Sequence, residues 1–211
     1  MVDKTMTKIN DEITIELADM EDAKGIYKTL KANLIEISDF NSIPKERIKN
    51  LEDRGFLRKE VDIEYYKELI LDKNCDIYVA KTIRGDIIGF ASIHKNEYDV
   101  RKIRSTLENL YIDDREIFAL LIDKDKKFAY LDQISIIPEF KRKRVGYAII
   151  SKALYELKSP IIAFIVEKPL ANKASFLWHE YCGFEFVGTA DGRYKGQKFE
   201  WRIYLNWNNK K

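Results

Sequence analysis

The sequence is poor in the residues that bind metals or build disulfide frameworks. It has two cysteines and two histidines among 211 residues. Cys75 and Cys182 lie far apart along the chain and match no zinc-ligand spacing, so a Cys/His metal site is not expected. We interpret both cysteines as reduced core thiols of a cytosolic protein.

The sequence also lacks a strong excess of charge and a long apolar run. Its 37 Lys and Arg residues oppose 35 Asp and Glu residues, which excludes a polycation that coats nucleic acid over its whole surface. The purest apolar run, Ile161 to Val166, is too short to cross a bilayer, and the charged stretch 1–12 does not resemble a signal peptide. We therefore expect a cytoplasmic protein with neither a membrane nor nucleic acid as its partner.

No linker rich in proline, glycine or serine divides the chain. Apolar residues make up 45% and charged residues 34% of the sequence, which is typical of a folded globular protein. We therefore predict one domain over residues 1–211. Residues 95–127 carry dense charge of both signs, with apolar residues at helical spacing, and we interpret them as a solvent-facing, partly helical insertion.

Hydrophobic periodicity predicts the elements that precede this insertion. Apolar residues alternate in some segments and recur at helical spacing in others, and a turn signal at 84–86 favours a β-hairpin. The predicted elements are a strand at 13–17, a helix at 21–37, a helix at 63–71 and hairpin strands at 76–82 and 87–93. The charged stretch 38–59 breaks the pattern, apart from the small apolar island 55–57.

After the insertion, the pattern predicts a parallel strand–helix–strand unit. A strand at 128–137 precedes a basic loop at 141–144 and a helix at 145–157, and the apolar strand 161–166 follows. Two strands of the same direction joined by a helix pair in parallel. Further on, we expect a helix at 172–182 and two strands at 184–187 and 199–205, joined by turn signals at 191–192 and 195–196.

The basic loop is the first candidate functional motif. A loop between a strand and a helix directs backbone N–H groups and the positive helix end to one point, which suits an anion. Four cations, Lys141 to Arg144, stand at that point and Gly146 follows, although a basic run of this kind also suits a solvated turn. The segment Pro138 to Ile150 resembles the acetyl-CoA loop of the GNAT N-acetyltransferase superfamily, whose pattern is Pro, two or three residues, Gln/Arg-x-x-Gly-x-Gly/Ala and an apolar helix. Arg144 stands where that family has its first Gly, a residue that tolerates φ > 0.

The segment Asn172 to Phe184 resembles the second cofactor motif of the superfamily, Asn-x-x-Ala/Ser-x-x-x-Tyr-x-x-x-Gly-Phe. His179 stands where most members carry Tyr. In this it resembles an uncharacterised bacterial and archaeal branch of the superfamily, which carries His at this position. At about 100° per residue, Asn172, Ser175 and His179 share a polar face of roughly 60°. A face that merely meets water is the alternative. We predict that the core-facing side of this helix consists of Ala174, Leu177, Trp178 and Tyr181.

The resemblance implies a GNAT fold of the α/β (α+β) class. Such a fold has a central mixed, mostly antiparallel sheet of about seven strands, a parallel βαβ unit at the cofactor site and about four flanking helices. The implied reaction transfers an acetyl group from acetyl-CoA directly to a primary amine of a small molecule or peptide, without a metal, and a homodimer is compatible with it. The implied cofactor-binding residues are Ile134, Ser135, Ile136, Lys141, Arg142, Lys143, Arg144, Val145, Gly146, Tyr147, Ala148, Asn172, Ser175 and His179.

The implied chemistry needs a base for the amine, a donor for the thioester oxygen and an acid for the leaving thiolate. We expect a backbone N–H within 134–136 to meet the oxygen, and His179 to donate a proton or a hydrogen bond to the sulfur. Asp132, a charged residue in mid-strand, is the predicted base, with pairing to a neighbouring Arg or Lys as the alternative. Glu167 and Phe56 are weaker predictions for the substrate site, and a minor core contact is the alternative for Phe56.

Two other functions compete with acetyl transfer. A nucleic-acid-binding module would use the basic loop, but no stripe of aromatic and basic residues surrounds that loop. A non-catalytic acyl-CoA-binding or sensor domain on the same fold is the stronger rival. It is favoured by Arg144 in the first motif and by the absence of Tyr at position 179.

Overall fold

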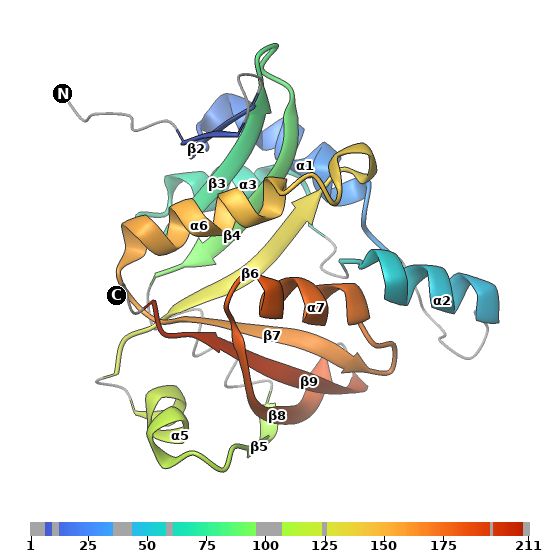
Figure 1. Ribbon diagram of the computed structural model, residues 1–211, viewed down its shortest axis with the longest axis vertical. Coiled ribbons are helices and arrows are strands. Elements are labelled where there is room, and N and C mark those ends of the chain that lie inside the picture. The colour runs from blue at the N-terminus through green and yellow to red at the C-terminus, as the bar shows by residue number, and fades with distance from the viewer. Residues whose placement is uncertain are drawn as a thin grey trace. The chain divides into compact units, whose positions relative to one another are not determined.

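The computed structural model describes residues 7–9, 13–35, 44–57, 61–95, 107–123, 126–194 and 196–208 (Figure 1). The chain forms two compact units, each assembled from three separate stretches. Unit 1 comprises residues 1–35, 57–95 and 131–158, and unit 2 comprises residues 36–56, 96–130 and 159–211. The single domain expected over residues 1–211 stays a prediction.

Unit 1 is built on antiparallel strands with helices on both faces. Its strands lie in the order β1-β2-β3-β4-β6, and the pairings of β1 with β2, β2 with β3 and β3 with β4 are antiparallel. The strands are β1 (Thr7–Ile9), β2 (Ile13–Leu17), β3 (Cys75–Thr82), β4 (Ile87–His94) and β6 (Ala129–Ile136). The helical elements are η1 (Met20–Asp22), α1 (Ala23–Lys31), α3 (Ile63–Leu71), η3 (Pro138–Phe140) and α6 (Val145–Leu157).

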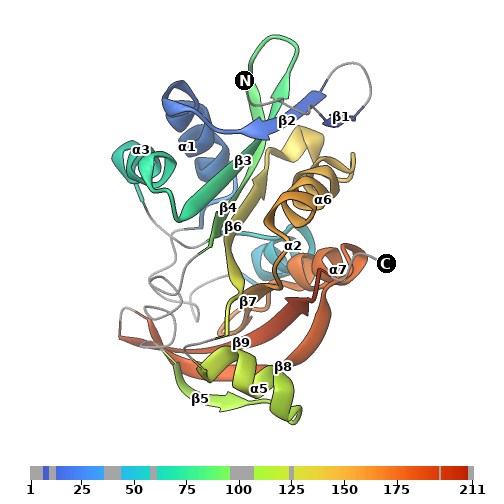
Figure 2. The same ribbon diagram turned by 90° about the vertical axis from the view of Figure 1, so that its left-hand side faces the viewer.

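Helices α1 and α3 cover one face of β3 and β4, and α6 covers the opposite face (Figures 1 and 2). Leu30 of α1 and Tyr66 of α3 form a fully buried cluster with Val79 and Phe90 of the two strands. Because neighbouring residues of a strand point to opposite faces, Tyr78 is directed to the α6 side, where its hydroxyl bonds to Glu156. The hairpin strands are thus buried on both faces, which explains their nearly continuous apolar sequence.

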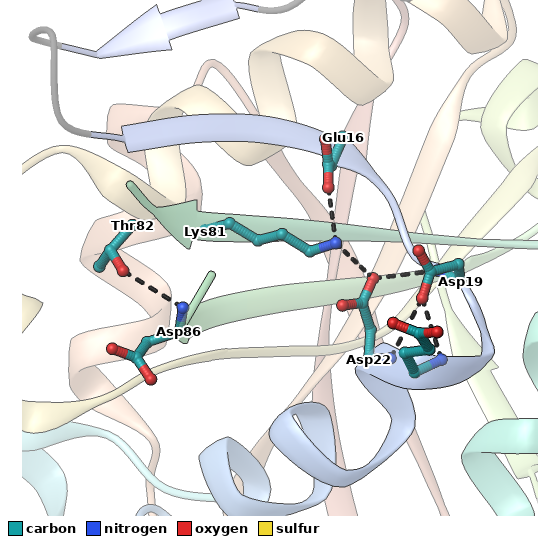
Figure 3. A network of polar contacts seen from close by, with 7 residues as sticks. Glu16, Asp19, Asp22, Lys81, Thr82 and Asp86 are labelled. Carbon is teal, nitrogen blue, oxygen red and sulfur yellow. Dashed lines mark hydrogen bonds and ion pairs between the residues drawn. The ribbon is translucent and has the colours of Figure 1, made fainter. Parts of the chain in front are cut away.

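A partly buried lysine, Lys81, joins β3 to β2 and to the start of α1 (Figure 3). The Nζ of Lys81 lies 2.6 Å from Oε1 of Glu16 and 2.8 Å from Oδ2 of Asp22. The carboxylate of Asp22 also accepts a hydrogen bond from the backbone N–H of Asp19 and completes the capping box at η1. Burial lowers the pKa of Lys81, but the hydrogen bonds with Asp22 and Glu16 outweigh burial and raise the pKa overall. The cluster therefore holds a charged lysine between two carboxylates.

Unit 2 is built on a second set of strands, in the order β6-β7-β9-β8-β5, which begins with the first residues of β6. Its strands are β5 (Leu107–Tyr111), β7 (Ile161–Lys168), β8 (Glu185–Tyr194) and β9 (Gln197–Asn206), and its helices are α2 (Lys45–Arg54), α5 (Arg115–Ile122) and α7 (Lys173–Tyr181). Strands β6 and β7 pair in parallel, Ala129 with Ile161 and Tyr130 with Ile162. The pairings of β5 with β8, β7 with β9 and β8 with β9 are antiparallel.

Alternating residues of β9 face α5 and α7. Ile203 and Leu205 join Leu120 of α5 in one buried cluster. Tyr204, which lies between them in sequence, points to the other face. There its ring stacks on Phe176 of α7 with the ring centroids 6.2 Å apart. Helix α7 is thereby held on the sheet by aromatic contacts.

The predicted fold class is confirmed: a mixed, mostly antiparallel α/β sheet with a parallel pair and flanking helices. The described residues contain nine strands, and β1 and β5 are additional to the seven predicted ones. They also contain six α-helices, of which α2 was not predicted. No residue of α2 is fully buried, and Ile48 and Leu51 are the only apolar residues among its ten, so periodicity gave little signal there.

Three local predictions are wrong, because residues distant in sequence supply the partners. The predicted helix 21–37 ends at Lys31, since the N–H of Ile35 donates to the carbonyl of Leu57. Residues 107–111 of the insertion form β5 and not a helix, whereas α5 confirms a helical part; residues 96–106 and 124–125 lie outside the described residues. The turn expected at 191–192 lies inside β8, where Asp191 accepts hydrogen bonds from Asn109 and Tyr111 of β5.

Candidate functional site

The connection from β6 to α6 has an unusual backbone. Arg142 and Arg144 have φ values of 63° and 61°, in the left-handed region that side chains other than glycine disfavour. Arg144 is the N-cap of α6, and no side chain among the described residues caps that end. The first backbone N–H groups of a helix lack intrahelical acceptors and carry its positive end. This connection can therefore receive an anion.

Some of the expected cofactor-binding residues in this connection have exposed side chains, and others have buried ones. Arg142, Lys143 and Arg144 are exposed, and Tyr147 retains 43% of its exposure, so their side chains can meet a ligand. Val145, Gly146 and Ala148 are buried in the face of α6 that packs on the sheet. For these three, the expectation of cofactor contact can hold only through the backbone.

Arg144 stands where the family has a glycine, and it adopts a positive φ of 61°, which glycine tolerates. We therefore expect Arg144→Gly to raise the stability by about 1 kcal/mol, because glycine adopts this conformation without steric cost. In a chain of this size, that change raises Tm by about 2 to 4 °C.

The matched control is Lys143→Gly, which removes a neighbouring exposed cation outside the residues with positive φ. It is expected to lower Tm slightly, because glycine gains more freedom in the unfolded chain. A lower Tm for Arg144→Gly would contradict the left-handed strain. Unchanged stability with weaker acetyl-CoA binding would instead identify the guanidinium as a phosphate ligand.

The last residues of β6 are fixed to α1 by side-chain hydrogen bonds. The hydroxyl of Ser135 donates to the carbonyl of Thr29 at 3.0 Å and accepts from Nδ2 of Asn33 at 2.8 Å. The same Nδ2 lies 2.9 Å from the carbonyl of Ile136. The side chain of Ser135 is therefore committed to packing, and its expected role toward a cofactor is restricted to its backbone. Asn33, which the sequence did not single out, sets the position of this strand end.

Asp132 lies in a cluster of polar side chains from β4, β6 and α3. Its Oδ2 is 3.6 Å from Nε2 of His94 and 3.4 Å from the hydroxyl of Tyr65. The next residue of α3, Tyr66, donates to Oε1 of Gln133 at 2.6 Å. Burial, followed by the charges of Tyr65 and Asp132, raises the pKa of Tyr66. Asp132 thus has a histidine and two tyrosines around it.

Sequence reasoning missed His94 and Tyr65. His94 directly follows the predicted hairpin strand 87–93 and ends the observed β4, and Tyr65 lies on a predicted helix 67 positions before Asp132. The available signal was weak: one of the two histidines directly follows an apolar strand. Nothing local indicated that it would meet a carboxylate of another strand.

The predicted orientation of helix α7 is wrong. His179 retains 1% of its exposure, whereas Leu177 and Tyr181, assigned to the core-facing side, retain 69% and 59%. The aromatic side chains of β8 and β9 cause this, since the ring of His179 lies 5.2 Å from that of Phe184 and 5.7 Å from that of Tyr204. The supposed polar face of the helix is therefore its buried face.

The environment of His179 does not suit a charged proton donor. Burial lowers its pKa to about 4, although a hydrogen bond with the carbonyl of Ser175 opposes this shift. Nδ1 lies 2.7 Å from that carbonyl, which can only accept, so the neutral ring carries its proton on Nδ1. Nε2 has no hydrogen-bond partner in the part of the chain that the structure describes. Of the two roles considered for His179, this environment disfavours the imidazolium that donates a proton, and a hydrogen bond with the sulfur stays a prediction.

The other predicted residues of unit 2 make structural contacts. Nδ2 of Asn172 donates to the carbonyl of Phe56 at 2.9 Å, and the side chain of Phe56 is buried. The core contact considered as the alternative for Phe56 is therefore the better description. Glu167 accepts hydrogen bonds from Nε and a terminal nitrogen of Arg202 at 2.9 and 2.6 Å. Its carboxylate is thus already engaged with a cation, which weakens the expected role at the substrate.

The described residues hold no candidate for a membrane span or for a metal centre. No helix among them has both the length and the apolar character needed to cross a membrane. Within the same residues, no group of three or more His, Cys, Asp and Glu side chains is placed to hold a metal ion.

Comparisons with known proteins agree on one family. Residues 45–184 match the family described as the Acetyltransferase (GNAT) family. A curated relative from Archaeoglobus fulgidus, described as an uncharacterized N-acetyltransferase, is 23% identical over 124 residues, which are 59% of this chain and 69% of the relative. The family match over residues 45–184 includes both the β6–α6 connection and α7.

Solved structures show the same fold. The ribosomal-protein-S18-alanine N-acetyltransferase of Escherichia coli has a TM-score of 0.56 at 12% identity, over 94% of this chain and 96% of that chain. A mutant form of the spermidine N-acetyltransferase of Vibrio cholerae has a TM-score of 0.55 at 19% identity, over 94% of this chain and 95% of that chain. Since the family match extends over more than half of the chain, this protein belongs to the GNAT acetyltransferase family.

Proposed function

We propose that this protein transfers an acetyl group from acetyl-CoA to a primary amine. The observation that carries the proposal is the β6–α6 connection of a GNAT family member. It combines a helix N-terminus without a side-chain cap, two arginines whose backbone lies in the left-handed region, and a run of four cations, Lys141 to Arg144. Backbone N–H groups and side-chain cations together suit the pyrophosphate of a CoA thioester.

The strand that precedes the connection suits the extended arm of the same cofactor. Within unit 1, β6 is the last strand in the order and pairs with β4 on one side. The backbone N–H and C=O groups on the other side of a last strand form no hydrogen bonds with a strand of the same unit. An extended amide chain can pair with an edge of this kind. A backbone N–H of Ile134, Ser135 or Ile136 would then meet the thioester oxygen as it gains charge.

Acetyl transfer also requires a base for the acceptor amine. Asp132 precedes Ile134 by two residues on β6, a rise of about 7 Å along a strand. We propose that its carboxylate accepts the proton of the acceptor ammonium. The amine nitrogen then attacks the thioester carbonyl and the carbon–sulfur bond breaks. The nitrogen releases its second proton to solvent as the amide forms, and the CoA thiolate takes up a proton from solvent. The acid role expected for His179 is not carried into this proposal, because its environment favours the neutral ring.

A non-catalytic acyl-CoA-binding domain remains the second candidate. It is favoured by the buried, neutral His179 at the position where most relatives carry an acidic tyrosine. Thiol release from acetyl-CoA with a panel of amines separates the two functions. Spermidine, lysine, a peptide with N-terminal alanine and an aminoglycoside represent the classes of acceptor.

Acetyl-CoA is expected to stabilise the folded protein, since it binds the folded state and not the unfolded one. At about 100 times its Kd, the gain is about 2.7 kcal/mol, or roughly 5 to 10 °C in Tm. The double variant Lys141→Ala/Lys143→Ala should reduce the shift, whereas Lys158→Ala, at the far end of α6, should not. If acetyl-CoA, CoA and longer acyl-CoAs all leave Tm unmoved, the cofactor assignment is wrong.

A further inference from the structure

Two side chains from different elements converge on one carboxylate oxygen of unit 1. Nε2 of His94 lies 3.6 Å and the hydroxyl of Tyr65 lies 3.4 Å from Oδ2 of Asp132. Both distances exceed those of strong hydrogen bonds, so the three groups are close without being locked together. Catalytic hydrogen bonds are often this long before substrate binds.

The side chains of His94 and Asp132 differ in their exposure to solvent. The side chain of His94 retains 5% of its exposure and that of Asp132 retains 11%. The carboxylate is thus the more exposed of the two groups, as the proposed contact with a ligand amine requires. The nearest ionisable groups on the elements packed against His94 are Tyr65 and Tyr66 of α3, Cys75 and Asp76 of β3 and Lys95, which follows His94 in sequence and pairs with Asp76 at 2.6 Å.

A carboxylate alone is a poor match for the proposed proton transfer. The ordinary pKa values are near 3.9 for Asp and near 10.4 for an alkyl ammonium, whereas that of imidazole is near 6.5. A base works best when its pKa lies near the operating pH. An imidazole behind the carboxylate supplies such a base, and the resulting imidazolium forms an ion pair with the carboxylate.

We propose that His94 holds the proton that Asp132 takes from the acceptor amine, and that Tyr65 fixes the carboxylate between them. This inference rests on the proposed acetyl transfer. The N–H bond of the ammonium breaks and its electron pair stays on nitrogen. The proton passes through Oδ2 of Asp132 to Nε2 of His94, which closes the 3.6 Å gap into a hydrogen-bonded ion pair. Asp132 is then the catalytic residue, and His94 and Tyr65 are positioning residues.

The first test measures the pair without any assay of activity. The chain has two histidines, so the NMR spectrum of the imidazole ring protons contains two sets of signals. At one fixed pH, Asp132→Asn should shift the ring signals of His94, because the carboxylate oxygen lies 3.6 Å from Nε2 of that ring. Asp76→Asn, a matched loss of charge on the neighbouring strand, should shift them much less. Unmoved His94 signals in Asp132→Asn overturn the pair.

The second test uses thiol release with spermidine, or with whichever panel amine reacts fastest. Asp132→Asn should lower kcat by about 10²- to 10⁴-fold. His94→Gln should lower it by roughly tenfold or more and move the acid limb of the pH profile, while the Tm shift caused by acetyl-CoA stays as in wild type. Tyr65→Phe should cost a few-fold, because the tyrosine only orients the carboxylate.

The outcomes separate this inference from the function on which it rests. Wild-type kcat and an unchanged pH profile in His94→Gln, with active wild-type enzyme, overturn the role of His94 alone. A His94 signal that responds to Asp132→Asn, without thiol release from any amine of the panel, overturns the acetyl transfer and the catalytic role of the pair with it.

Discussion

Lowering the pH from about 6.5 to about 4 is expected to cost the folded protein roughly 3 kcal/mol through His179 alone. The unfolded chain takes up a proton on this histidine near pH 6.5, whereas burial keeps the folded side chain neutral to about pH 4. Between these values, the unfolded state binds more protons than the folded state. The stability linked to His179 is therefore complete above the upper pH, decreases as the pH falls, and levels off below the lower one.

The size of this effect follows from the surroundings of the ring. Trp178, Phe184 and Tyr204 place aromatic rings within 5.7 Å of His179, measured between ring centroids. An imidazolium there would lose its hydration and gain only the carbonyl and the hydroxyl of Ser175, which Nδ1 already meets. Desolvation of a charge without a compensating partner is costly.

Urea unfolding at several pH values measures this effect against His179→Phe, which keeps an aromatic ring in the cage and cannot titrate. The stability of wild type relative to this variant should fall by about 1.4 kcal/mol per pH unit across the interval. Tyr181→Phe, at an exposed position of the same helix, should follow wild type at every pH. Parallel curves for wild type and His179→Phe would show that the ring is not buried as a neutral group.

Replacing Lys81 by methionine is expected to destabilise the protein by about 3 kcal/mol, or roughly 6 to 12 °C in Tm. Methionine fills the position of the side-chain stem but leaves Glu16 and Asp22 without the cation that joins them (Figure 3). The side chain of Asp22 retains 9% of its exposure, so water replaces the lost ion pair poorly. Removing one partner of a buried pair costs more than the pair itself contributes.

A second substitution and a matched control make this result specific. Adding Glu16→Gln to Lys81→Met should recover part of the loss, because the repulsion between two carboxylates disappears. Lys67→Met removes a cation from the pair of Lys67 with Glu64, whose side chains retain 38% and 69% of their exposure, and should cost less than about 1 kcal/mol. Equal losses of stability in Lys81→Met and Lys67→Met would show that the burial of Lys81 adds nothing to the strength of its ion pairs.

The stabilisation by Lys81 also depends on pH. Because the pKa of Lys81 is raised in the folded protein, this stabilisation is complete below pH 10.5 and is lost at higher pH.

The elements whose partners are close in sequence could be predicted with good accuracy. The β3–β4 hairpin, the β6–α6–β7 unit and α3 all lie within a few residues of the predicted ranges. Periodicity and turn residues act over short stretches of chain, and these elements satisfy them locally. The positive φ of Arg144 was predictable for the same reason, since a loop that needs glycine imposes its backbone on whatever residue stands there.

The candidate site shows the limit of such local signals. The spacing along α7 puts Ser175 and His179 on one face, and their side chains do meet there, but spacing cannot say which side of a helix meets the sheet. That side was set by the aromatic residues of β8 and β9, which bury His179 and leave Tyr181 exposed. The charge of Asp132 in mid-strand, by contrast, could be recognised in the sequence.

The partners of that carboxylate were not visible, because they depend on how three separate elements pack. His94 ends β4, and Tyr65 lies on α3, with 67 positions between the tyrosine and Asp132. Local sequence specifies each of these elements but not their neighbours in space. Packing of α3 on the strands brings the hydroxyl of Tyr65 and the ring of His94 to one oxygen of Asp132, and this convergence turns a lone aspartate into a candidate proton-accepting site.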